Sequence, residues 1–238
     1  MKLVGGTLAV RACAPYPPTR HCRVDAAGKH QDQRLMWLPL SMKRGETWTD
    51  LGGVQRDPAE VIANALDESW LGQLSPPNGL VPVPRSECPG SSWPPKTDWP
   101  GLAIASAIRS RTGAKIFRAL WRHATVEKSS TAEVAGRPRA TIHDHLNSIE
   151  AIQVDLLPAV ITLVDDTLTR GTQLAAAVEC LRTAGYEGDI QALTAAHVLG
   201  GPHEPREWRV EISIEWDSAS DYAARTIEEE LPDWYFDL

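Results

Sequence analysis

Residues 159–199 read AVITLVDDTLTRGTQLAAAVECLRTAGYEGDIQALTAAHVL, and this stretch decides the fold. It begins with a continuous apolar run at 159–164, of the kind that parallel sheets bury on both faces. A polar turn containing a glycine follows, then a helix with one apolar face at 173–184 and a second apolar strand at 190–196. This order predicts a right-handed βαβ unit whose turn lies at the carboxyl edge of a parallel sheet.

The turn at 165–172 combines two adjacent carboxylates with a helix entry rich in Thr and Gly. A helix N-terminus has free N–H groups and a partial positive charge, so it can bind a phosphate, and the hydroxyls of Thr169 and Thr172 add donors. The carboxylates would repel that phosphate unless they bind sugar hydroxyls or Mg²⁺ attached to it. Two interpretations therefore remain open: a ribose 5-phosphate site, or an acidic pair that only caps the helix.

The rest of the chain shows weaker patterns of short elements separated by Pro and Gly. Loop composition marks residues 86–100 and 128–141, and alternating polarity at 209–216 predicts a half-exposed strand. The other expected elements are extended segments within 2–10 and 34–42, a helix at 58–74 with Asp57 as N-cap, an apolar strand at 80–84, a helix at 101–111 and a strand at 114–121.

Composition narrows the class of protein. The chain has 238 residues, of which 42% are hydrophobic and 23% charged, enough for one sizeable core or two small ones. No run of about 18 apolar residues is present, and the N-terminus lacks the apolar region of a signal peptide. Four cysteines without a CxxC pair suit a reducing compartment. These features predict a cytoplasmic protein with no membrane partner.

The formal charge of −7 is unevenly distributed. Residues 203–238 hold 11 acidic and 3 basic residues, whereas residues 1–202 hold 20 acidic and 21 basic ones. The stretch 109–139 is locally basic, with eight cations against two acids: Arg109, Arg111, Lys115, Arg118, Arg122, Lys128, Arg137 and Arg139, against Glu127 and Glu133. A short basic stretch favours a small anionic ligand over nucleic acid, which normally needs an extended basic face, although nucleic acid is not excluded.

Residues 161–172, ITLVDDTLTRGT, resemble the phosphoribosyl pyrophosphate (PRPP) signature of type I phosphoribosyltransferases: an apolar strand, two acids, two apolar residues and Thr-Thr-Gly-Ala-Thr. Residues 80–86, LVPVPRS, resemble the Leu-Val-Pro-Val-Pro segment of the ComF-like branch, and residues 42–45, MKRG, resemble its Lys-Tyr-x-Gly entry. The resemblance covers residues 43–199. Thr167 and Gln173 depart from the signature, and the four-cysteine zinc module common in that branch is missing.

The resemblance implies an α/β fold with a parallel-sheet, Rossmann-like phosphoribosyltransferase domain at 43–202, an N-terminal accessory segment at 1–42 and an acidic C-terminal extension at 203–238. It implies that Asp165 and Asp166 hold the ribose hydroxyls, with one of them near Mg²⁺ or the departing ring. Residues implied to wrap the 5-phosphate are Thr169, Arg170, Gly171, Thr172 and Gln173. Residues implied to bind pyrophosphate are Arg85 after the 80–84 strand, and Arg122 and Lys128 in a flexible loop.

The implied function is transfer of a phosphoribosyl group from PRPP to a nitrogen base, with Mg²⁺ as cofactor and release of pyrophosphate. The acceptor base stays unknown, because the motif describes the donor half only. The alternative is a non-catalytic PRPP- or nucleotide-sensing regulator, or a ComF-like accessory protein in DNA uptake or defence. A weaker third interpretation is a phosphate-site relic with a structural role. A homodimer is compatible with each.

Four further features each have two interpretations. Cys13, His21, Cys22 and His30 are candidate zinc ligands or ordinary buried and loop residues, and the latter is favoured because no CxxC pair is present. The sequence His143-Asp144-His145 suits metal or acid–base chemistry, or the opening of a helix, which is favoured. Trp93 and Trp99 could cover a ligand or fill the core. The acidic tail is a solvated face, or binds a basic surface.

Overall fold

A seven-stranded sheet forms the centre of the computed structural model, which describes residues 3–16, 38–42, 46–49, 53–87, 99–127, 136, 138–199 and 209–227. The strand order is β11-β10-β1-β9-β8-β4-β5. Strands β1, β9, β8, β4 and β5 pair in parallel, and β10 and β11 add two antiparallel pairings at one edge. The strand bounds are β1 Gly6–Tyr16, β4 Gly79–Pro82, β5 Lys115–Ile116, β8 Val160–Leu168, β9 Asp189–Val198, β10 Val210–Trp216 and β11 Ala224–Ile227.

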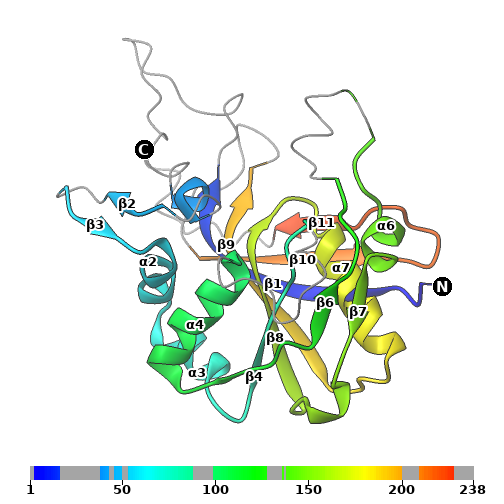
Figure 1. Ribbon diagram of the computed structural model, residues 1–238, viewed down its shortest axis with the longest axis horizontal. Coiled ribbons are helices and arrows are strands. Elements are labelled where there is room, and N and C mark those ends of the chain that lie inside the picture. The colour runs from blue at the N-terminus through cyan, green and yellow to red at the C-terminus, as the bar shows by residue number, and fades with distance from the viewer. Residues whose placement is uncertain are drawn as a thin grey trace, which may run out of the picture.

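Helices cover both faces of this sheet (Figure 1). One face carries α2 (Pro58–Ala65), α3 (Glu68–Leu74) and α4 (Pro100–Thr112), and the other carries α6 (Ile142–Leu146) and α7 (Thr172–Thr183). The smaller elements are two ribbons, β2 (Trp48–Thr49) with β3 (Gln55–Arg56) and β6 (Leu120–Arg122) with β7 (Ile149–Ala151), and the 3-10 turn η2 (Val154–Leu156). The expected α/β fold with a mostly parallel sheet is therefore confirmed, and it is consistent with a Rossmann-like core.

The buried strands separate two hydrophobic clusters because successive side chains point to opposite faces. Leu80 and Val164 belong to the cluster under α2 and α4, whereas Val81 and Leu163 belong to the cluster under α7. This is the burial on both faces that the apolar run at 159–164 predicts. Within the described residues, no helix is both long and apolar enough to span a bilayer.

Strands β4 and β8 lie side by side at a topological switch point. They pair in parallel from Gly79 opposite Ile161 to Pro82 opposite Val164. The chain leaves β4 through α4 towards β5, and it leaves β8 through α7 towards β9, which lies in the opposite direction along the sheet. Open α/β sheets bind ligands in the crevice that this divergence leaves outside the carboxyl ends of the strands.

Several expected boundaries are wrong, each for an identifiable reason. The helix expected at 58–74 is two helices, because Asp57 and Asp67 each cap a new helix by accepting from the N–H groups of Ala59 at 2.7 Å and Trp70 at 2.9 Å. The strand expected at 114–121 is divided between β5 and β6, which belong to different sheets. Residues 38–42 are helical rather than extended, with Leu38 and Met42 in the α2–α4 cluster.

The most important correction concerns the acidic pair. Asp165 and Asp166 lie inside β8 rather than in the turn after it, since β8 continues to Leu168. Main-chain pairing with β9 extends this far, with Asp165 opposite Thr194 and Leu168 opposite His197. Leu168 is also buried in the α7-side cluster, which holds the end of the strand in the sheet.

Strands from all three expected segments join the one sheet. β1 comes from the 1–42 segment and pairs with β9, and β10 comes from the 203–238 extension and pairs with β1. Glu179 of α7 bonds to both of these added parts of the chain. It is only 2% exposed, and its carboxylate accepts from Val4 N at 3.0 Å, Gly5 N at 2.8 Å and Trp216 Nε1 at 2.7 Å. The N-terminal segment and β10 are thus both bonded to the helix that follows β8.

Replacing Glu179 is expected to destabilise the fold strongly. Glu179→Ala leaves the buried indole N–H of Trp216 and two main-chain N–H groups without their acceptor, which should lower the free energy of unfolding by about 2 kcal/mol or more. Chemical denaturation of the purified variant measures this loss. Glu187→Ala, at an exposed position just beyond α7, is the matched control and should change stability by less than about 0.5 kcal/mol. Equal effects of the two substitutions would contradict the assignment.

Candidate functional site

The candidate site lies where the segment after β4 meets the end of β8 and the start of α7. Val83 N donates to Val164 O at 2.9 Å, which continues the pairing of the two strands past Pro82. The side-chain amide of Gln173 then donates to Pro84 O at 3.1 Å and to Asp165 Oδ2 at 3.3 Å. The Gln173 side chain thereby joins the end of the LVPVPRS segment (80–86) to the acidic pair of the PRPP-like motif (161–172).

The two aspartates have different surroundings. Asp165 is only 7% exposed; its Oδ1 accepts from Asp166 N at 2.9 Å and its Oδ2 accepts from Gln173. Asp166 is half-buried and its Oδ2 lies 3.4 Å from the Thr167 hydroxyl that donates to it. Asp165 is therefore held in place by two donors, while the carboxylate of Asp166 is more accessible to a ligand.

Gly171 sets the entry to α7. Its φ of +85° lies in the left-handed region, and a Cβ at this position would be 2.8 Å from the side chain of Ile214 on β10. A glycine is thus needed both for the turn and for the close approach of β10. Ala175 N donates to Gly171 O at 2.8 Å, so the helix is regular from its first turn. The N–H groups of that turn have no acceptor within the helix and can meet an anion.

Arg170 is held by a residue that sequence analysis did not select. Its guanidinium carbon lies 5.4 Å from the ring centroid of Tyr222, and the Tyr222 hydroxyl donates to Arg139 O at 3.0 Å. Ile142 N also donates to Asp221 O at 2.8 Å. The segment between β10 and β11 therefore lies against both the turn before α7 and the entry to α6. No local pattern around Tyr222 indicates this contact.

The two described cations of the three expected to bind pyrophosphate, Arg85 and Arg122, lie in different parts of the fold. Arg85 follows β4 as expected and pairs with Glu87 at 2.9 Å, in a partly exposed ion pair that a ligand phosphate could replace at little cost. Arg122 lies in β6, not in a loop; its side chain is fully buried and donates to the Ser148 hydroxyl, because β6 pairs with β7 beside it. Lys128 lies outside the described residues.

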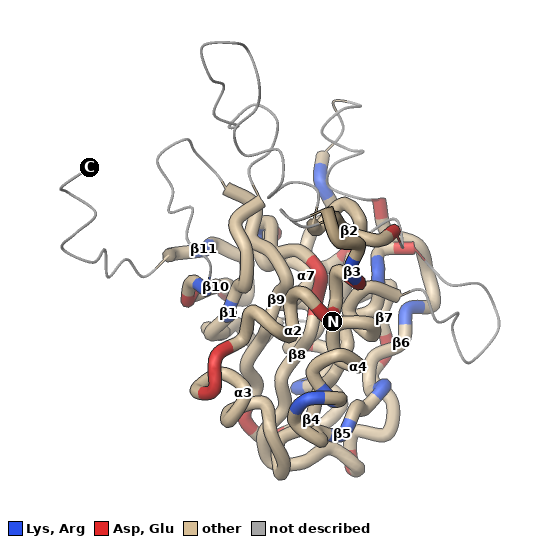
Figure 2. Tube along the Cα trace, turned by 90° about the vertical axis from the view of Figure 1, so that its left-hand side faces the viewer, with Lys and Arg blue, Asp and Glu red and all other residues tan. Residues whose placement is uncertain are grey.

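Part of the basic stretch is nevertheless concentrated in space. Figure 2 shows Lys and Arg positions around α4, β4 and β5. Four of the cations expected from the sequence belong to α4, β5 and the segment that follows: Arg109, Arg111, Lys115 and Arg118. They lie on α4 and along the β5 edge of the sheet.

Other candidates have structural roles in the described part of the chain. Trp99 stands at the N-cap position of α4, where its side chain is buried and donates from Nε1 to Val83 O at 2.5 Å. Trp93 lies outside the described residues. Cys13 is buried in β1, where burial raises the pKa of its thiol to about 12 and disfavours the thiolate that zinc requires. Its expected partners, His21, Cys22 and His30, fall outside the described ranges, as does the tail after Ile227.

The sequence His143-Asp144-His145 opens a helix, as favoured from sequence. Thr141 and Asp144 form a capping box at the start of α6. The hydrogen bonds from Thr141 to the Asp144 carboxylate hold the pKa of that group below its usual range. His145 is only 6% exposed, and its pKa is lowered to about 4 by burial first and by the Arg122 charge second, against the opposing effect of Asp144.

The donor set at the site fits Mg²⁺ only in company with a substrate. Mg²⁺ prefers oxygen ligands and commonly binds through one or two carboxylates together with substrate phosphates and water. Asp165 and Asp166 supply two carboxylates. Among the residues that the structure describes, no group of three or more His, Cys, Asp and Glu side chains could hold a metal ion by itself.

No protein-family model matches the chain, and no curated protein matches it either. The chemistry of the site is therefore inferred from its residues and their geometry.

Acid is expected to destabilise the protein through His145. Its pKa is about 4 in the folded state against 6.5 for an unperturbed histidine, so protonation favours the unfolded chain. The stability that neutral His145 contributes is complete above pH 6.5 and is lost as the pH falls towards 4, by at most roughly 3 kcal/mol. NMR titration of the His145 ring should give a midpoint near 4, and a midpoint near 6.5 would contradict its burial beside Arg122. The His145→Phe variant should not lose this part of its stability when the pH is lowered.

Proposed function

We propose that this protein binds a ribose 5-phosphate compound, foremost PRPP, in the crevice between the carboxyl ends of β4 and β8. The observation that carries the proposal is the bridge from the Gln173 amide to Pro84 O and Asp165 Oδ2. It brings the PRPP-like motif and the LVPVPRS segment together at the switch point of a parallel sheet, which is where such sheets bind ligands.

The 5-phosphate would bind at the turn from Thr169 to Thr172 and the first turn of α7. The left-handed Gly171 allows the main chain to approach closely there, and the N-terminal N–H groups and dipole of α7 favour a dianion. Arg170 adds a positive charge beside this turn, where Tyr222 orients its guanidinium. The Gln173 side chain is directed to Asp165 and Pro84, so its main-chain N–H is the part available to the phosphate.

The ribose would lie over the end of β8. Carboxylates accept hydrogen bonds from hydroxyl groups, and Asp166 is the more accessible acceptor, with Asp165 fixed beside it by Gln173. Mg²⁺, when bound with the substrate, would neutralise the charge that develops on pyrophosphate. Arg85 follows β4 and pairs with Glu87, and it could release Glu87 to bind a pyrophosphate oxygen instead.

The reaction that this arrangement would support is phosphoribosyl transfer. The bond between ribose C1 and the pyrophosphate oxygen breaks, a bond from C1 to a nitrogen of the base forms, and the base loses the proton from that nitrogen. The transition state resembles a ribosyl cation leaving a highly charged group, so fixed carboxylates near the ring and cations near the leaving group both lower its energy.

A non-catalytic PRPP or nucleotide sensor is the second candidate, and the position of Arg122 favours it. A transferase needs cations that close over pyrophosphate, whereas Arg122 is buried against Ser148. A sensor needs only the phosphate turn and the acidic pair. Accessory roles in DNA uptake or defence belong to this second candidate.

Calorimetric titration with PRPP and Mg²⁺ tests the binding proposal. The wild type should bind, and an Asp165→Asn/Asp166→Asn variant should bind at least about tenfold more weakly, because hydrogen bonds to charged groups contribute about 1.5–3 kcal/mol each. Asp155→Asn, an exposed acid in η2, is the matched control and should leave the affinity unchanged. Absence of binding to the wild type, or undiminished binding to the folded double variant, would contradict the proposal.

Release of pyrophosphate separates the two candidates. The wild type is incubated with PRPP, Mg²⁺ and a panel of purine and pyrimidine bases, and pyrophosphate is measured. Base-dependent release that the Asp165→Asn/Asp166→Asn variant lacks supports a transferase. Binding of PRPP without release for any base supports the sensor.

A further inference from the structure

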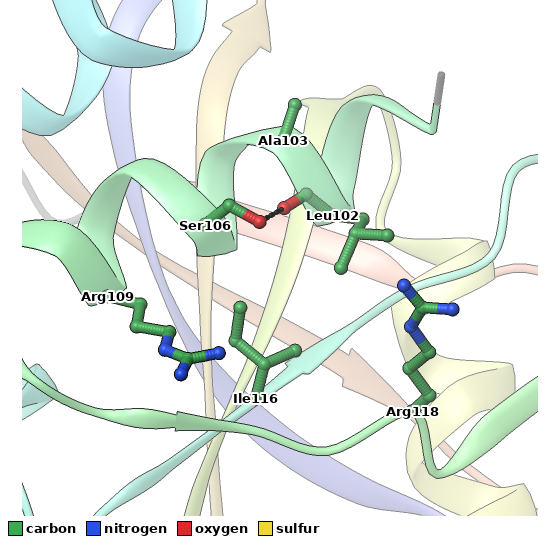
Figure 3. A pocket seen from close by; sticks show the side chains of 6 residues that line it. All are labelled: Leu102, Ala103, Ser106, Arg109, Ile116 and Arg118. Atoms are coloured by element: carbon green, nitrogen blue, oxygen red, sulfur yellow. Dashed lines mark hydrogen bonds between the residues drawn. The ribbon is translucent and has the colours of Figure 1, made fainter. Parts of the chain in front are cut away.

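A pocket lies between α4 and the edge strand β5. It has a volume of about 320 Å³ and is lined by Leu102, Ala103, Ser106, Arg109, Ile116 and Arg118. The first four come from α4, Ile116 comes from the edge strand β5, and Arg118 follows that strand (Figure 3). β5 is the last strand of the sheet on this side, so no further strand covers the pocket within the described part of the chain.

Two cations, Arg109 and Arg118, flank this pocket. Figure 3 shows the Arg109 and Arg118 side chains on either side of Ile116, one from α4 and the other from the segment after β5. None of the six lining residues is acidic, and in the described residues neither guanidinium has an ion-pair partner. The neighbouring Arg111, in contrast, is engaged with Ala63 O.

The remaining lining is apolar or has a single polar atom. Leu102 is buried and Ile116 half-buried, so they form an apolar surface between the two cations. The Ser106 hydroxyl donates to Leu102 O at 2.8 Å, which leaves its oxygen as an acceptor. Arginine pairs well with both phosphate and carboxylate, and the volume is within the range of small-molecule sites, about 300–1,000 Å³.

We propose that this pocket binds a small anionic molecule in which a phosphate or carboxylate group is attached to a compact apolar group. The oxyanion pairs with Arg109 or Arg118, which lie on either side of Ile116 (Figure 3), and the apolar group lies on Leu102 and Ile116. This site is separate from the crevice between β4 and β8. It shares α4 with that crevice, because Gly101 at the start of the helix packs against the main-chain oxygens of Val164 and Val83.

NMR titration with phenyl phosphate tests this proposal. Phenyl phosphate should shift the main-chain amide signals of Leu102, Ser106 and Ile116 at millimolar concentrations. An Arg109→Gln/Arg118→Gln variant should bind at least about tenfold more weakly, since each lost charged pairing contributes on the order of 1.5–3 kcal/mol. Lys115→Gln removes the same charge from an exposed side chain of β5 that does not line the pocket, and should change the affinity less than twofold.

Further ligands and one further variant decide among the sources of binding. Benzoate should shift the same signals if a carboxylate is sufficient for binding. If phenyl phosphate binds and benzoate does not, the site is specific for phosphates. Phenol should not bind. Binding should persist in the Asp165→Asn/Asp166→Asn variant, which separates this site from the proposed PRPP site. The proposal is overturned if phenyl phosphate leaves these signals unmoved, if phenol binds as well, or if Lys115→Gln weakens binding as much as the arginine variant.

Discussion

The parallel pairing of β4 with β8 is the constraint on which the candidate site depends. Because the chain leaves these strands in opposite directions, their carboxyl ends form a topological switch point, which is where open α/β sheets bind ligands. The main-chain bond from Val83 to Val164 and the Gln173 bridge keep the two strand ends in contact. Loss of this pairing would separate the acidic pair from the segment that holds Arg85.

Strands β1 and β10, which come from the two end segments of the chain, extend the sheet beyond β9 and support the end of β8 and the start of α7. Ile214 of β10 packs where a Cβ of Gly171 would be, and Trp216 bonds to Glu179 two turns further along α7. Tyr222 lies over Arg170 at the turn between β8 and α7. The acidic extension is therefore in part a structural support for the turn before α7: its described portion, residues 209–227, is bonded to the sheet and to α7.

Sequence patterns predicted the elements whose determinants are local. The apolar run at 159–164, the Asp57 cap and the helix after Gly171 all have short-range signals, and the structure has each of them. The features that were missed depend on contacts between distant residues. Continuation of β8 through Asp165 requires β9, burial of Arg122 requires Ser148 and β7, and the position of Arg170 requires Tyr222. None of these partners has a spacing that marks it in the sequence.

A crystal structure of the protein with ribose 5-phosphate tests the central claim most directly. The account predicts the 5-phosphate at the Thr169–Thr172 turn, within hydrogen-bond distance of main-chain N–H groups of α7, and the ribose hydroxyls on Asp165 or Asp166. A phosphate bound only in the pocket of Arg109 and Arg118, or no ligand at the end of β8 under saturating conditions, would contradict it.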